Sequence, residues 1–204
     1  MMRSILEEDT ALELQHINVK LPLQHTFGLD PVIPIFHEWI QKQIFDELLL
    51  DVADYRHVKD GPAIILIGHE ADYSIDRTDG RLGLRYNRKA PLPGNNQERL
   101  QQATRSALNA LRRLQTDTRL NGGPAFDGSE IEITINDRVL APNNSETRNL
   151  VARDFDILAA NLFQPGSFKL NYSDGGRRLF SVIIQTIAPH SVDELLTALQ
   201  YDRQ

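Results

Sequence analysis

The sequence contains no cysteine, so disulfide bonds, thiolate catalysis and cysteine-ligated metal sites are all excluded. Long apolar runs are also missing, and the longest, at 63–67, is far too short to span a bilayer. Residues 1–10 carry three acidic residues where a secretory signal would need a basic start and a long apolar core. We therefore expect a flexible N-terminal tail over 1–10 and a cytoplasmic protein of bacterial type, with no membrane association.

The motifs of several enzyme classes are absent as well. No glycine pattern fits a dinucleotide-binding or Walker loop, and no serine sits in a nucleophile elbow. The composition, with 41% hydrophobic and 25% charged residues, is that of an ordinary soluble globular protein. The sequence therefore predicts a folded protein without naming its chemistry, and no cofactor is expected.

Charge is distributed unevenly along the chain. Residues 77–119 hold ten Lys and Arg against three acidic residues, a net charge of +7. The remaining residues must then sum to −13, because the whole chain carries −6. This asymmetry predicts docking of an anion, a protein partner or a second copy of the chain, with a homodimer as the expected form. The alternative is that the basic segment neutralises the acidic remainder of its own chain.

A repeat organises the sequence. A Tyr-Ser pair followed by Asp-Gly and Arg-Leu occurs at 73–82 and again at 172–179, each time between apolar runs and ahead of a helical stretch. We interpret this as an α+β fold of two tandem β-α-β-β-α halves, with an antiparallel-rich sheet and the helices on one face. The first half spans 11–120, a linker 121–128 and the second half 129–204, in one compact body.

Apolar periodicity places the elements within these halves. The predicted strands are 11–21, 48–55, 63–74, 81–88, 131–135, 168–172 and 179–186. Four helices are predicted. The first begins at 30 or 34, and the second begins at 97 with Asn96 as its cap. The third carries Val151 on its apolar face, and the fourth runs from 192 to 201.

The cluster His69, Glu70 and Asp72 is the first candidate for catalysis or metal binding. The predicted hairpin register sets His69 against Tyr86 and Glu70 against Arg85. Neighbouring residues of a regular strand point to opposite faces, so His69 and Glu70 cannot both bind one ion. We therefore expect a core histidine, a cross-strand ion pair of Glu70 with Arg85, and no bound metal.

A hydrolase or metal-dependent enzyme centred on His69, Glu70 and Asp72 is the alternative. It needs Asp54 or His57, from the neighbouring strand and its turn, to converge on this cluster. Whether the protein is an enzyme stays open at this point.

Arginines of the basic segment form the second candidate, as a site for an anion or a partner. Convergent guanidinium groups bind phosphate or carboxylate through paired hydrogen bonds, so a small anionic ligand fits this set. The alternative is a solvated basic face with no ligand. Nucleic acid is not expected, because exposed aromatic residues do not interleave with these cations. The residues are Arg81, Arg85, Arg88, Arg105 and Arg112.

The runs 68–74 and 80–89, together with 136–138 and 141–143, resemble an uncharacterised family of conserved hypothetical bacterial proteins. That resemblance implies no activity. As a fold, the duplicated strand-helix-sheet-helix unit is also similar to TATA-box-binding proteins, whose saddle uses a basic sheet and intercalating phenylalanines. This chain lacks both features at recognisable positions, so the similarity informs architecture and not DNA binding.

The leading hypothesis from the sequence is a non-catalytic binding or assembly protein that uses the basic patch in 77–119.

Overall fold

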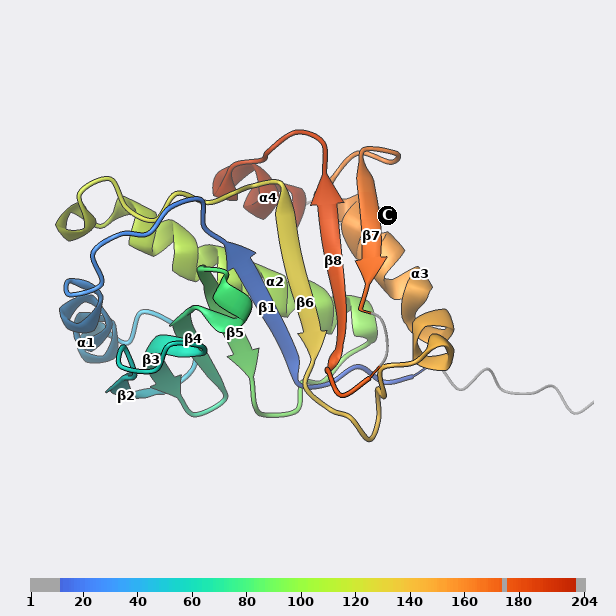
Figure 1. The fold of residues 1–204 in the computed structure, drawn as a ribbon, viewed down its shortest axis with the longest axis horizontal. Coiled ribbons are helices and arrows are strands. Elements are labelled where there is room, and N and C mark those ends of the chain that lie inside the picture. The colour runs from blue at the N-terminus through green and yellow to red at the C-terminus, as the bar shows by residue number, and fades with distance from the viewer. Residues whose placement is uncertain (1–11, 174–175, 201–204) are drawn as a thin grey trace, which may run out of the picture.

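The computed structural model describes residues 12–173 and 176–200, so the predicted tail at 1–10 and residues 174–175 of the repeat lie outside the described part. The described residues form four α-helices and one eight-stranded antiparallel sheet, in the order β2-β3-β4-β5-β1-β6-β8-β7 (Figure 1). The strands are β1 (Ile17–Pro22), β2 (Leu49–Asp54), β3 (Pro62–Gly68), β4 (Ala71–Asp76), β5 (Gly83–Arg88), β6 (Glu130–Ile135), β7 (Phe168–Tyr172) and β8 (Phe180–Thr186). The helices are α1 (Val32–Lys42), α2 (Asn96–Thr116), α3 (Ser145–Leu162) and α4 (Val192–Ala198). The α+β class is confirmed.

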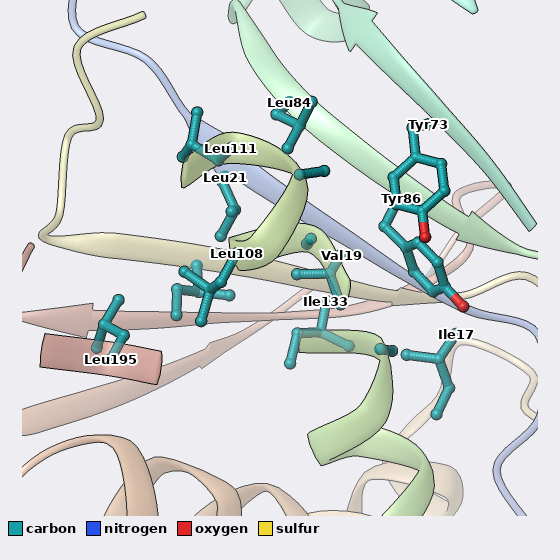
Figure 2. Close-up of a cluster of buried hydrophobic side chains, with 14 of the residues drawn as sticks. Ile17, Val19, Leu21, Tyr73, Leu84, Tyr86, Leu108, Leu111, Ile133 and Leu195 are labelled. Atoms are coloured by element: carbon teal, nitrogen blue, oxygen red, sulfur yellow. The ribbon is translucent and has the colours of Figure 1, made fainter. Parts of the chain in front are cut away.

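The helices pack on one face of this sheet. Helix α2 lies against β1 and β5, α1 against β2 and β3, and α3 against β7, while α4 packs on α2 and α3. Because side chains of a strand alternate between faces, Val19 and Leu21 of β1 point toward α2 and meet Leu108 and Leu111 (Figure 2). One buried apolar cluster therefore joins both halves of the chain.

Strand β1 pairs with β6, which makes the sheets of the two halves continuous. The predicted linker runs beside this junction, where the Gln24 N–H donates to the Ala125 carbonyl and the Asp127 N–H to the Pro22 carbonyl. Gly122 and Gly123 both adopt positive φ, which glycine accepts without the Cβ clash of other residues. The segment 121–128 is thus packed along the end of β1.

The opposite face of the sheet is polar, and none of the four described α-helices packs on it. Lys20 of β1 and Asp76 of β4 are buried there and form an ion pair of 2.7 Å. The connection between β4 and β5 folds over them, and Lys20 Nζ also donates to the Thr78 carbonyl at 3.0 Å. Gly83 is required beneath this ion pair, because a Cβ there would sit 3.0 Å from the Lys20 side chain and 2.9 Å from the Leu21 carbonyl.

Three predicted element boundaries are wrong. The strand expected over 11–21 begins only at Ile17. The strand expected over 63–74 is two strands, β3 and β4, because the chain reverses at His69 and Glu70. Asn95, not Asn96, caps α2: its side chain accepts from the Glu98 N–H while Glu98 accepts from the Asn95 N–H. The Asn96 amide instead donates to the Leu12 carbonyl.

The predicted register between β4 and β5 is also wrong. Tyr73 pairs with Tyr86, and Ala71 pairs with Arg88. The loop between these strands is longer than expected, since it includes a short 3₁₀ turn at Thr78–Gly80. The register moves by an even number of residues, so the apolar side chains keep the predicted face.

Candidate functional site

All ten basic residues of 77–119 have partners within the chain. Among them Arg81 pairs with Glu130, Lys89 with Asp72 at 2.6 Å and Arg99 with Glu13 at 2.6 Å. Seven of the ten pair with carboxylates, most of which lie outside 77–119, whereas Arg77, Arg105 and Arg113 donate to backbone carbonyls. These ion pairs favour the alternative interpretation for part of the segment. Besides Arg81, Lys89 and Arg99, the basic residues of 77–119 with partners in the chain are Arg77, Arg85, Arg88, Arg105, Arg112, Arg113 and Arg119.

The five arginines predicted to converge are divided among three places. Arg81 and Arg85 line a small hollow of about 250 Å³ on the polar face of the sheet. Arg88 and Arg105 line a different pocket, on the side of the sheet that carries the helices. Arg112 lies outside both pockets, 3.6 Å from Asp193 of α4.

The cluster His69, Glu70 and Asp72 does not converge either. His69 is exposed at the tip of the β3–β4 hairpin, so the expectation of a core histidine is wrong. Glu70 pairs with Arg88 at 2.9 Å, not with the predicted Arg85. Asp72 pairs with Lys89 on the polar face.

His57 and Asp54 lie at the far end of β3 from this cluster. The connection that holds His57 joins β2 to the start of β3, whereas His69 follows the end of β3. A seven-residue strand extends roughly 20 Å, which is too far for a shared ion or proton. Asp54 is held by Arg56, which lowers the pKa of its carboxyl to about 2.

A pocket beside α2 collects a different set of residues. It has a volume of about 540 Å³ and lies between α2, the β3–β4 hairpin and the connection from α1 to β2. This volume is in the range of small-molecule sites. Its lining residues are Ile44, Phe45, Asp46, Glu47, Glu70, Tyr73, Arg88, Gln102, Arg105, Ser106, Asn109 and Arg113.

Glu47 and Tyr73 form the polar centre of one wall. The Tyr73 hydroxyl donates to Glu47 Oε1 at 2.7 Å, and the Ala71 N–H donates to Glu47 Oε2 at 2.8 Å. Burial raises the pKa of the Glu47 carboxyl above its usual range, and it raises the pKa of Tyr73 as well. Gly68 leaves room for this carboxylate, because a Cβ there would lie 2.8 Å from Glu47 Oε2.

Aromatic rings connect this wall to the core. The Phe45 ring stacks on the Tyr73 ring with centroids 4.6 Å apart, and the Tyr86 ring meets Tyr73 edge-on at 5.2 Å. The two tyrosine side chains lie side by side, with both hydroxyls at the same end of the pair (Figure 2). These contacts fix the Tyr73 hydroxyl, and with it the Glu47 carboxylate, before any ligand is bound.

The facing wall is a polar stripe on α2. Gln102, Ser106, Asn109 and Arg113 recur at helical spacing and all line the pocket. The adjacent stripe of α2, which includes Leu111, is buried in the core. The polar stripe of α2 therefore lines the pocket, while the adjacent apolar stripe packs in the core.

Sequence analysis missed Glu47, Tyr73, Gln102, Ser106, Asn109 and Arg113 as site residues. The polar spacing along 96–116 was visible in the sequence. Nothing in that spacing distinguishes a pocket wall from a solvated helix face.

Within residues 12–173 and 176–200, no group of three or more His, Asp or Glu side chains could hold a metal ion. No helix in the same ranges has the length and apolar character needed to cross a membrane. A comparison of the chain with models of known protein families found no match, and a comparison with curated proteins found none either.

Proposed function

We propose that this chain is a non-catalytic binding protein whose α2 pocket takes a small organic anion. The observation that carries the proposal is the polar stripe of α2, with Arg105 and Arg113, turned toward a pocket of about 540 Å³. Guanidinium groups bind carboxylate and phosphate through paired hydrogen bonds with fixed geometry, so two of them at one pocket suit an anionic group.

Both α2 arginines retain donors for a ligand. Arg105 uses Nη2 for the Leu199 carbonyl at 2.9 Å, and Arg113 uses Nη2 for the Ile44 carbonyl at 3.5 Å. A guanidinium group carries five N–H donors, so each side chain keeps others. Arg88 differs, because all three of its nitrogens already bond to the protein, Nη1 to Glu70, Nε to the Ala90 carbonyl and Nη2 to the Pro91 carbonyl. Arg88 supports the pocket wall, and the α2 arginines contact the anion.

Titration of the protein with acetate, succinate and inorganic phosphate, followed by calorimetry or by NMR shifts, tests the proposal. We expect Arg105→Gln and Arg113→Gln to weaken binding roughly tenfold or more, since hydrogen bonds to charged groups contribute about 1.5–3 kcal/mol. Arg112→Gln is the matched control, because Arg112 is next to Arg113 on α2 but does not line the pocket. Equal loss in all three variants, or no binding by the wild type, contradicts the proposal.

The hydrolase hypothesis has no converging residue set to support it, because His69, Glu70, Asp72 and His57 lie in separate places. A role in assembly stays a prediction. Arg105 and Arg112, which motivated it, bond within their own chain.

A further inference from the structure

The walls of the α2 pocket carry opposite charges. Asp46 and Glu47 come from the connection between α1 and β2, while Arg105 and Arg113 come from α2. The third acid and the third arginine of the lining, Glu70 and Arg88, neutralise one another in an ion pair of 2.9 Å. Asp46 and Glu47 on one wall and Arg105 and Arg113 on the other are left to face a ligand. Of these, Arg113 reaches across to the first wall, at the Ile44 carbonyl and the Phe45 ring.

Glu47 has no directly bonded cation in the described part of the chain. Arg88 lies near enough to lower the pKa of the Glu47 carboxyl, but Arg88 itself is bonded to Glu70. Glu47 makes no ion pair with the described residues, and its two hydrogen bonds come from the neutral Tyr73 hydroxyl and the Ala71 N–H. Each carboxylate oxygen has two lone pairs, so both oxygens can accept a further donor. A half-buried carboxylate without a bonded counter-ion is unfavourable, and a positively charged ligand group would remove that cost.

The neutral side chains between the two walls suit the same kind of ligand. Ser106 is close to the Tyr73 hydroxyl, and Gln102 bonds to Ser106 Oγ at 3.1 Å and to the Tyr86 hydroxyl at 3.3 Å. These groups both donate and accept, so they can solvate either end of a polar ligand. No apolar side chain interrupts the α2 stripe from Gln102 through Ser106 and Asn109 to Arg113.

We propose that the ligand is a small zwitterion, whose ammonium group binds Glu47 and whose carboxylate binds Arg105 and Arg113. The inference rests on the proposed function and narrows it from organic anions in general to amino acids or amines that carry an acidic group. A zwitterion can place its ammonium group against the acidic wall and its carboxylate against the basic wall at the same time, which a simple anion cannot do.

A series of ω-amino acids tests the zwitterion directly on the wild-type protein. Glycine, β-alanine, γ-aminobutyrate and 5-aminopentanoate carry the same two charges at increasing separation, and the matched probes are acetate, propionate, butyrate and pentanoate. We expect one length of amino acid to bind at least tenfold more tightly than the carboxylate of equal length. Equal affinity within each pair overturns the zwitterion and leaves the anion pocket standing. No binding by any probe overturns both proposals.

Two variants separate the two ends of the ligand. Glu47→Gln keeps the size of the side chain, and we expect it to abolish the tenfold preference for the amino acid, because it removes the charge that pairs with the ammonium group. Arg105→Gln should weaken both probes. Asp51→Asn is the matched control, because it removes an exposed negative charge outside the pocket. A preference that survives in Glu47→Gln, or that is lost equally in Asp51→Asn, overturns the assignment of the ammonium group to Glu47.

Discussion

Tyr73 and Tyr172 lie in a single row of cross-strand neighbours, each on the third strand out from the β1–β6 junction. A two-fold duplication about that junction requires this placement. The duplication itself stays a prediction, and superposing 11–118 on 127–204 tests it. The row is Tyr73, Tyr86, Val19, Ile133, Val182 and Tyr172.

The two tyrosines should respond differently to loss of the hydroxyl. Tyr73→Phe removes the donor to Glu47, and we expect a loss of about 1–2 kcal/mol in the free energy of unfolding. Tyr172→Phe is the matched control, since the Tyr172 ring contacts Arg148 through its face and its hydroxyl makes no hydrogen bond with the described residues. Urea denaturation of both variants measures the difference, and equal losses would contradict the role given to Glu47.

The stability of the protein should depend on pH through Glu47. The pKa of its carboxyl is raised in the folded protein above the ordinary 4.5, so the folded state holds the proton more tightly than the unfolded state. The free energy of unfolding therefore falls as the pH rises from about 4.5 through the raised folded value. Glu47→Gln should remove this part of the slope. Identical pH profiles of the variant and the wild type would show that Glu47 titrates normally.

Gly68→Ala should destabilise the β3–β4 hairpin. An added Cβ would lie 2.4 Å from the Ala71 carbonyl oxygen, so the backbone must shift, at a cost of roughly 1–3 kcal/mol. Gly28→Ala is the control, because no atom lies within 4 Å of its Cβ position and its φ is not positive. Thermal unfolding compares the two variants, and a melting temperature of Gly68→Ala equal to that of Gly28→Ala would disprove the close packing of Glu47.

Lys20 and Asp76 should be strongly coupled. Lys20→Met leaves the buried Asp76 with only the more distant Arg85, at 3.4 Å, so we expect a loss of about 3 kcal/mol in the free energy of unfolding, the lower end for breaking a buried ion pair. Adding Asp76→Asn to Lys20→Met should recover part of that loss. A double-mutant cycle by denaturant unfolding measures the coupling. Additive losses in the cycle would argue that the two side chains do not interact.

Reversal of charge on α2 should affect stability and not association. Arg105 bonds to the Leu199 carbonyl and Arg112 faces Asp193, so replacing both by Glu should loosen the contact of α2 with α4. Sedimentation at low and high salt should give the same oligomeric state for the wild type and the double variant. Dissociation of a dimer into folded monomers would instead place these arginines at an interface.

Local patterns in the sequence were sufficient for the α+β class and for the face on which most buried residues lie. Period-two apolar alternation identified β6, and period-3.6 spacing identified α2 and α3, because each depends on neighbours along the chain. The side chains of Tyr73 and Tyr86 kept their predicted face even though their register moved.

The pocket was decided by tertiary structure alone. Its walls come from 44–47, from the β3–β4 hairpin, from the end of β5 and from α2, which are far apart in sequence. Their meeting depends on the reversal at His69 and on the length of the β4–β5 loop, where a change of a few residues moves every cross-strand partner. The partners of the charged side chains were also decided by tertiary structure. The sequence showed a basic segment with a net charge of +7, and only the fold placed each cation beside its own partner.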